Sequence, residues 1–159
     1  MGSQSDWPVM KFTKTTLAEF GLDCTVHVMS AHRTPHDAAI FATNAQENGY
    51  QVIIAAAGGA AHFAGVLAGH TILPIIGVPV KGWALDGMDS LLSTVQMPKG
   101  VPVATVAIGK AGAINAAVLT VQMLAINDAE LSSKLMQYKN EMADAVRKAD
   151  AELQNQLNL

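Results

Sequence analysis

Residues that can transfer a proton and bind an anion occur together in "MSAHRTP" (29–35), which contains Ser30, His32 and Arg33. Histidine is the side chain whose ordinary pKa lies near neutrality, so it can give and accept a proton at cellular pH. Arginine suits a phosphate because its planar guanidinium donates two hydrogen bonds. This combination favours acid–base chemistry on a phosphorylated ligand, although a histidine in a loop can also be a plain surface residue.

A second group of polar residues opens the chain in "MGSQSD" (1–6). The hydroxyls of Ser3 and Ser5, with the free amides at the start of a helix, can bind a phosphate, and Gly2 allows close backbone approach. Asp6 would repel a bare phosphate, so it fits a ligand that also carries hydroxyl groups, such as a ribose. The alternative for Asp6 is a simple helix N-cap.

The third candidate stretch is "AAAGGAAHFAG" (55–65). Gly58 and Gly59, followed by small residues, can leave backbone amides free to bind a carboxylate or another oxyanion. His62 is then expected in the first turn of the following helix. Tight packing of a helix on a sheet also favours glycine and alanine, so this pattern alone leaves both interpretations open.

No metal or cofactor is expected from the remaining residues. The spacing that zinc ligands require is absent, as are the glycine-rich motifs of dinucleotide and nucleoside-triphosphate sites. Cys24 is the single cysteine of the sequence and excludes an internal disulfide framework. The three other histidines, which are assigned to structure or solvent, are His27, His36 and His70.

Strand-like and helix-like stretches alternate along the chain, which predicts an α/β fold with a parallel, doubly wound sheet. The strands are expected at 24–29, 52–57, 74–80 and 101–108. The helices are expected at about 7–20, 34–49, 88–97 and 110–126, with another after the glycine-rich turn. Ligands of such sheets bind beyond the carboxyl ends of the strands, where all three candidate stretches fall. The segment 86–100 has no chemistry that its residue types explain.

The chain from residue 129 onward differs in pattern. Apolar residues recur there at steps of three and four, which indicates one apolar stripe on a long polar helix. We therefore divide the chain into an α/β catalytic domain, 1–128, and a C-terminal amphipathic helix, 129–159. The stripe can lie on its own domain or on a neighbouring subunit.

Composition narrows the classes of partner. Charged residues make up 14% of the chain, against roughly 25% in typical domains, so much of the surface is expected to be buried in a homo-oligomer. The net charge of −3 argues against nucleic acid, whose partners carry a basic surface. No signal peptide or apolar stretch long enough to span a membrane is found, and we expect a soluble cytoplasmic protein.

Five stretches together closely resemble the N5-carboxyaminoimidazole ribonucleotide mutase family of de novo purine synthesis, over nearly all of the chain to about residue 130. They are "GSQSDW", "SAHRTP", "GYQVIIAAAGGAAH", "LPIIGVPV" and "GMDSLLSTVQMPKGVPVATVAIGKAGAINAA". The resemblance implies a flavodoxin-like, three-layer αβα fold and a homo-octamer whose C-terminal helix contacts a neighbour. It implies a ribonucleotide substrate, whose carboxylate moves from the exocyclic nitrogen to carbon 4 of the imidazole, without biotin, ATP or metal.

The resemblance also implies roles for single residues. Ser3 and Arg33 match the positions that hold the 5′-phosphate, and Asp6 matches the one that holds the ribose hydroxyls. His32 matches the general acid–base. The remaining candidates for substrate binding are Ser5, Ser30, Gly58, Gly59 and His62, of which the last three lie in the loop that surrounds the migrating carboxyl group.

The implied chemistry is decarboxylation followed by recapture. A carbamate loses CO2 readily once its nitrogen is protonated, and the electron-rich carbon 4 can then attack that CO2. A closed pocket would retain CO2 at high effective concentration. His32 would supply the first proton and remove the carbon-bound one afterwards.

Two alternatives remain. A sister class carboxylates aminoimidazole ribonucleotide directly with CO2; it carries lysine where this chain has Arg33, and a different loop in place of "GGAAH". A flavodoxin-like module that binds a phosphorylated ligand such as FMN, without catalysis, would need an aromatic residue near the ligand, and Trp7 and Trp83 are the tryptophans available.

The chain departs from the family pattern at Ala56, Ala64 and Trp83, where glycine, proline and a small residue are usual. Family members also carry an apolar strand directly before the "MGSxSD" motif. We therefore expect the first, central strand to be absent here and Met1 to be an internal methionine of a longer protein. The resulting slot would expose unpaired backbone groups, each costing about 1–3 kcal/mol if buried.

Overall fold

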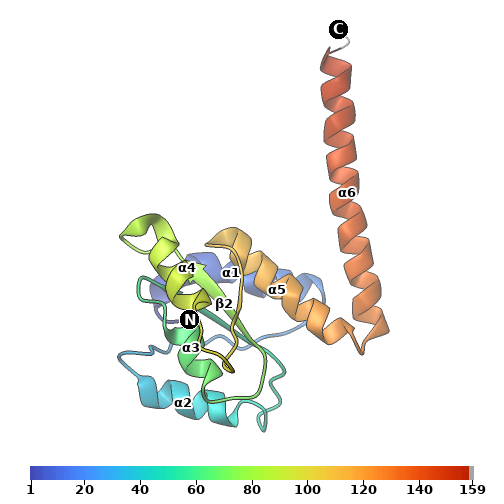
Figure 1. Cartoon of the computed structure of the whole chain (residues 1–159). Helices are drawn as coiled ribbons and strands as arrows, with labels where there is room; N and C mark the ends of the chain where they lie inside the picture. The colour runs from blue at the N-terminus through green and yellow to red at the C-terminus, as the bar shows by residue number, and fades with distance from the viewer. Residues whose placement is uncertain (158–159) are drawn as a thin grey trace. The chain divides into compact units, whose positions relative to one another are not determined.

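The computed structural model describes residues 1–157. The chain divides into two compact units, the first being Met1–Thr120 and the second beginning at Val121. The first unit contains a parallel sheet with helices on both faces, as the alternating sequence pattern predicts (Figure 1). The long C-terminal helix belongs to the second unit.

Three parallel strands form the sheet, in the order β1-β2-β3. They are β1 (Ile53–Gly58), β2 (Ile75–Val80) and β3 (Ala104–Thr105). Ile53 pairs with Ile75 and Gly58 with Val80, so β1 and β2 end together. Every residue of β2 is buried, which agrees with its continuous apolar sequence and a position covered on both faces.

One face of the sheet is covered by α2 (Pro35–Asn44), α3 (Phe63–Ala68) and α4 (Met88–Val95). The core on this side consists of small and branched apolar residues, including Ala38, Ala42, Ile53 and Leu67. Small residues bring the helices close to the strands. Gly77 of β2 shows how close, since a Cβ placed there would clash with the Thr94 methyl group of α4.

Two further helices, α1 (Trp7–Glu19) and α5 (Lys110–Ala125), complete the α/β arrangement. The buried Thr13 hydroxyl of α1 donates a hydrogen bond of 2.8 Å to the Ala113 carbonyl of α5, which ties the two helices together. Short 3-10 turns precede α1 (Gln4–Asp6) and α4 (Leu85–Gly87).

The prediction of a strand at 24–29 is wrong, since this segment forms no strand in the structure. Its backbone bonds to Met1: the Met1 amine donates to the His27 carbonyl (2.8 Å), and the Met29 amide donates to the Met1 carbonyl (3.0 Å). These are the two bonds of a single parallel bridge between Met1 and Val28. A strand needs a partner along its length, and one residue supplies only one bridge.

The gap between segment 24–29 and β1 is bridged by the N-terminal residues of the chain. The Gly2 amide donates to the Ala56 carbonyl (2.8 Å), so Met1 and Gly2 lie between segment 24–29 and β1. Along the rest of the gap, Val26 and Val28 remain 42% and 54% exposed. Within residues 1–157, the backbone bonds that link segment 24–29 to β1 are those of Met1 and Gly2.

Other boundaries shift by a few residues. The fourth predicted strand, 101–108, contracts to β3, and the predicted helix 34–49 ends as α2 at Asn44, after which the chain turns. The predicted helices 88–97 and 110–126 are confirmed as α4 and α5 with small changes at their ends.

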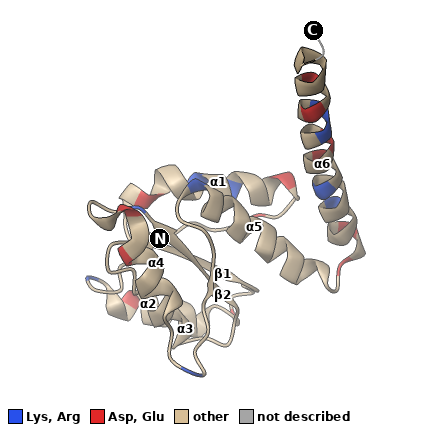
Figure 2. Ribbon diagram, turned by 45° about the horizontal axis from the view of Figure 1, so that its top comes forward, with Lys and Arg blue, Asp and Glu red and all other residues tan. Residues whose placement is uncertain are grey.

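The C-terminal helix α6 (Ala129–Leu157) spans 29 residues. Charged residues of both signs follow its length, whereas large parts of the other helices carry few (Figure 2). Its apolar side chains Met142, Val146 and Leu153 are 48%, 70% and 51% exposed. Within residues 1–157, no helix combines the length and apolar character that a membrane span needs.

Candidate active site

The three stretches that carry chemistry meet beyond the carboxyl end of β1. Gly2 binds the end of this strand through the Ala56 carbonyl, which brings the first stretch there. Met29, the first residue of the second stretch, bonds to Met1. The third stretch is the continuation of β1 itself. The parallel fold thus brings together residues that lie far apart in the sequence, as predicted.

His32 and His62 are in direct contact. The Nε2 atom of His32 lies 3.0 Å from Nδ1 of His62, and the rings meet edge to face with their centroids 5.1 Å apart. A hydrogen bond between two imidazole nitrogens requires that one carry a hydrogen and the other a free lone pair. Both side chains are exposed. The pair can therefore pass a proton to a ligand from a position open to it.

Ser3, Ser5 and Asp6 form a compact cap where the first helical turn begins. The Ser3 hydroxyl oxygen accepts hydrogen bonds from the Ser5 amide (3.3 Å) and the Ser5 hydroxyl (2.8 Å). The Asp6 carboxylate accepts one from the Ser3 amide (3.1 Å). Together these contacts are a capping box with Ser3 as the N-cap. Asp6 therefore does take part in capping, from the third helical position.

Capping does not use the whole Asp6 carboxylate. The residue is 6% exposed, and its contact with the Ser3 amide involves only its Oδ2 atom. Burial raises the pKa of Asp6, while the Ser3 amide and the nearby Met1 amine oppose that rise. A buried carboxylate gains from further hydrogen-bond donors, and the hydroxyls of a bound sugar are donors of this kind.

Ser30 shapes the turn that carries His32 and Arg33. Its hydroxyl oxygen accepts from the amides of His32 (3.3 Å) and Arg33 (3.1 Å), and its own amide donates to the Thr34 hydroxyl (2.8 Å). Ser30 is thus engaged within the turn. The exposed Arg33 guanidinium has no ion pair with any residue of 1–157, so it is free to bind an anion.

The glycine-rich turn is tightly packed. Gly59 adopts a φ of 65°, which favours glycine, and a Cβ at Gly82 would lie 3.2 Å from the Gly59 amide nitrogen. The Gly59 amide faces the end of β2, because Gly58 pairs with Val80 in the parallel ladder. The turn therefore leaves little space between its own backbone and that of the neighbouring strand.

Most amides of this turn are engaged, contrary to the open nest that the sequence indicates. The Ala61 amide bonds to the Gly59 carbonyl (2.8 Å) and to the Ser93 hydroxyl (2.9 Å). The His62 amide bonds to the Ala60 carbonyl (2.8 Å). Within the described residues, no bond is found for the amides of Gly58 and Ala60, and the exposed Ala60 amide lies within the turn itself.

One residue at this turn is not identified from the sequence. Ser93, on α4, binds the turn directly, yet a single serine in a helix carries no motif that would single it out. Trp83 is 95% exposed, and its ring edge lies 3.8 Å from the Cβ position of Gly59. The sequence singles out Trp83 as a departure from the family pattern and as an aromatic residue that a flavin would need, and its place beside Gly59 comes from the structure. Of the other departures, Ala56 and Ala64 are both buried.

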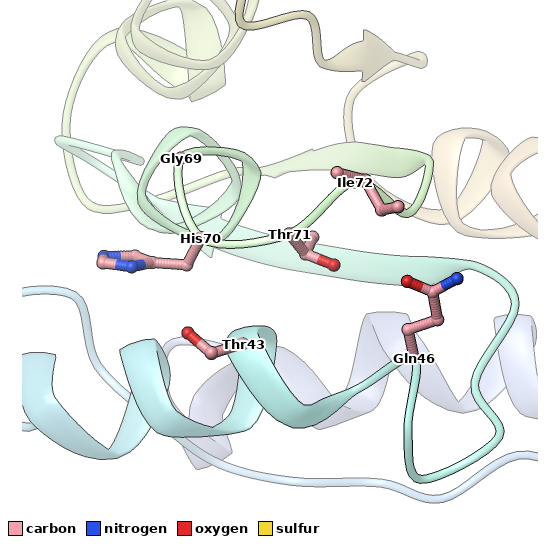
Figure 3. Close-up of a pocket in the computed structure, with 6 residues that line it drawn as sticks. All are labelled: Thr43, Gln46, Gly69, His70, Thr71 and Ile72. Atoms are coloured by element: carbon pink, nitrogen blue, oxygen red, sulfur yellow. The ribbon is translucent and has the colours of Figure 1, made fainter.

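A separate hollow lies away from this turn, beside the segment that leads into β2. It is lined by that segment (69–72), together with Thr43 of α2 and Gln46, which follows that helix (Figure 3). His70 belongs to it, whereas the ring of His27 packs at 5.3 Å from that of Phe41. Among residues 1–157, no group of three or more potential metal ligands is found.

Comparison with known protein families matches residues 1–145 to the family described as AIR carboxylase. The Escherichia coli K12 protein called N5-carboxyaminoimidazole ribonucleotide mutase is 53% identical over 146 residues, 92% of this chain and 86% of that protein. The protein of the same name from Mycobacterium tuberculosis H37Rv is 54% identical over 154 residues, 97% of this chain and 87% of that one.

The fold has close counterparts among solved structures. The crystal structure of Treponema denticola PurE aligns with a TM-score of 0.85 and covers 96% of this chain and 94% of its own. A second crystal structure from the same organism, of a PurE2 variant, aligns equally well. Sequence identity to these two is 23% and 22%, so they support the fold and no finer statement.

Proposed function

Because this chain belongs to the AIR carboxylase family, we propose that it is an enzyme that converts N5-carboxyaminoimidazole ribonucleotide into 4-carboxy-5-aminoimidazole ribonucleotide. Relatives more than 50% identical over most of their length bear the name of that mutase. The observation that carries the proposal is the His32–His62 contact of 3.0 Å at the glycine-rich turn. The exposed Arg33 follows His32 directly, and the buried Asp6 lies in the N-terminal stretch that bonds to β1.

The ligand-binding roles follow from the charges of the site. Arg33 would bind the 5′-phosphate with two charge-assisted hydrogen bonds, and the Ser3 hydroxyl would donate to the same group. The Ser5 hydroxyl, which donates to the Ser3 oxygen (2.8 Å), would orient the Ser3 hydrogen toward the phosphate. Asp6 would accept hydrogen bonds from the ribose hydroxyls. Ser30 would contribute mainly by shaping the turn, since its hydroxyl already accepts two backbone amides.

The reaction is a rearrangement in which atoms and protons balance. Protonated His32 gives its proton to the carbamate nitrogen, the N–C bond breaks, and CO2 and an amine form. Carbon 4 of the imidazole then attacks CO2, and neutral His32 removes the hydrogen from that carbon. The second step returns the histidine to its starting state, so one residue serves as acid and as base.

The glycine-rich turn would hold the migrating CO2. The Ala60 amide would stabilise the carboxylate before and after the transfer, and the backbone of Gly58 and Gly59 would surround it closely. Bound substrate would cover the turn and limit the escape of CO2, which keeps its effective concentration at carbon 4 high. His62 would hold the His32 ring in position through their shared hydrogen bond.

Direct carboxylation of aminoimidazole ribonucleotide is the second candidate, since the family description names a carboxylase. The relatives above 50% identity favour the mutase instead. The test is to supply the carbamate in one reaction, and aminoimidazole ribonucleotide with bicarbonate in another. We expect the 4-carboxy product rapidly in the first reaction; rapid product in the second alone would favour the carboxylase.

We further propose that the chain works as a cytoplasmic homo-octamer in which the helix from residue 129 onward packs on a neighbouring subunit. The exposed apolar side chains along α6 support an interface, and the family resemblance supports the number. Light scattering on the purified chain measures it directly, and a monomer would contradict this part of the proposal.

A further inference from the structure

The segment 86–100 supplies no group that would contact the substrate, but its helix α4 binds the glycine-rich turn. The Ser93 hydroxyl oxygen lies 2.9 Å from the Ala61 amide nitrogen and 2.7 Å from the Asp89 carbonyl oxygen. A hydroxyl has one hydrogen, and the Asp89 carbonyl is its nearest acceptor. The Ser93 oxygen is thereby left as an acceptor for Ala61.

Thr94, which follows Ser93 in α4, lies near the carbonyl group of Ala61. The Thr94 hydroxyl lies 2.7 Å from the Ser90 carbonyl, to which it donates, and 3.4 Å from the Ala61 carbonyl. Thr94 and Ala61 are 2% and 1% exposed. The Ala61 amide also bonds to the Gly59 carbonyl within the turn (2.8 Å). Ser93 and Thr94 therefore add the contacts that fix this buried residue relative to α4.

The helix α4 is itself anchored to the sheet. The buried Ser90 hydroxyl lies 2.7 Å from the carbonyl of Val80, the last residue of β2. The absence of a side chain at Gly77 lets Thr94 pack directly on the same strand. A continuous path of contacts therefore runs from β2 through α4 to Ala61.

We propose that Ser93 is a positioning residue for the reaction. By holding Ala61, it fixes the positions of the two groups that flank Ala61 in the chain. On one side is the Ala60 amide, which the described part of the chain leaves available to a ligand. On the other is His62, whose Nδ1 atom lies 3.0 Å from His32. This role rests on the proposed function, because the turn matters to catalysis only if it holds a migrating carboxyl group.

Loss of the Ser93 hydroxyl should loosen the turn without removing any group that binds the phosphate or ribose. CO2 would then escape more often between the two steps, and His32 would lose its fixed partner. The expected signature is a lower kcat with a nearly unchanged KM, together with more label from the medium in the product. A variant that is only less stable would not incorporate more label from the medium into the product.

The experiment compares Ser93→Ala, Ser93→Thr and Ser133→Ala with the unaltered chain, using the carbamate substrate in medium containing 13C-bicarbonate. Ser133→Ala is the matched control, since Ser133 donates the same kind of intrahelical bond, to the Ala129 carbonyl at 2.9 Å, on α6. Circular dichroism and amide exchange of Ala61 by NMR report folding and the bond itself.

For Ser93→Ala we expect kcat to fall about tenfold or more, KM to change less than about twofold, and 13C incorporation to rise. Ser93→Thr, which keeps the hydroxyl, should recover most of the rate, and Ser133→Ala should match the unaltered chain. Unchanged 13C incorporation in Ser93→Ala, or impairment of Ser93→Thr equal to that of Ser93→Ala, would overturn the positioning role. An unaltered chain that does not convert the carbamate would instead overturn the proposed function, and the inference with it.

Discussion

The Nε2 atom of His32 lies 3.0 Å from the Nδ1 atom of His62, although 30 positions separate the two residues in the chain. His32 comes from the turn before α2, and His62 from the end of the glycine-rich turn after β1. Their contact makes the carboxyl edge of β1 the centre of the site. It also means that the two facing nitrogens share a single hydrogen, because one must donate and the other accept.

Replacement of His32 by asparagine tests the proton transfer. We expect His32→Asn to bind the ribonucleotide with nearly unchanged affinity and to lose at least about a hundredfold in kcat, the range typical for a general acid–base. Steady-state turnover and calorimetric binding of the product measure the two effects. His36→Asn, at an exposed histidine in the first turn of α2, is the control. Turnover of His32→Asn near the level of the unaltered chain would exclude this role.

Replacement of Arg33 by alanine tests phosphate binding. Loss of a charge-assisted pair of hydrogen bonds, worth about 1.5–3 kcal/mol, should raise KM roughly tenfold to a hundredfold with a smaller effect on kcat. The dephosphorylated nucleoside is the control ligand. It should bind weakly, and with equal affinity, to the unaltered chain and to Arg33→Ala. If Arg33→Ala weakened the binding of nucleotide and nucleoside alike, the phosphate would lie elsewhere.

The pKa of Asp6, raised chiefly by burial, predicts a pH dependence of opposite sign for stability and for binding. Stability from this group is fully present below its unfolded pKa and is lost as pH rises through the folded one. Ribose hydroxyls donate to the ionised form, so affinity should increase over the same rise in pH. Calorimetry of the unaltered chain and of Asp6→Asn across acidic pH measures both effects. An affinity profile that Asp6→Asn leaves unchanged would rule out this contact.

The gap beside β1 predicts uneven hydrogen exchange along one strand. The Ile53 amide donates to the Pro74 carbonyl, so the backbone groups of Ile54 point to the other side of β1, toward segment 24–29. We expect the amides of Ile54 and His27 to exchange at least about ten times faster than that of Ile53 in native-state NMR. Equal protection of Ile53 and Ile54 would mean that another segment fills the gap in solution.

The sequence predicts the sheet well where burial decides the structure. The strands 52–57 and 74–80 are continuous apolar runs, and burial on both faces requires such runs. The convergence of the three candidate stretches follows from parallel topology, since the exits of the strands lie on one edge. The helix α4 is recognisable from its apolar spacing, without any indication of what it binds.

What the sequence does not predict depends on contacts between distant segments. Residues 24–29 have the composition of a strand, but a strand also requires partners, and Met1 supplies a single bridge. Glycine and alanine at 58–61 indicate free amides, yet Ser93 and the turn itself engage that of Ala61. Composition cannot show which amides of a turn are taken.

The retention of the carboxyl carbon tests the central claim, that the site holds CO2 while a histidine moves the proton. The carbamate is supplied with 13C in its carboxyl group, in medium containing unlabelled bicarbonate, and the product is analysed by NMR. We predict that nearly all of the product retains the label at the carboxyl group on carbon 4. A product whose label has equilibrated with the medium would show that CO2 leaves the site during the reaction, and the mechanism described here would be wrong.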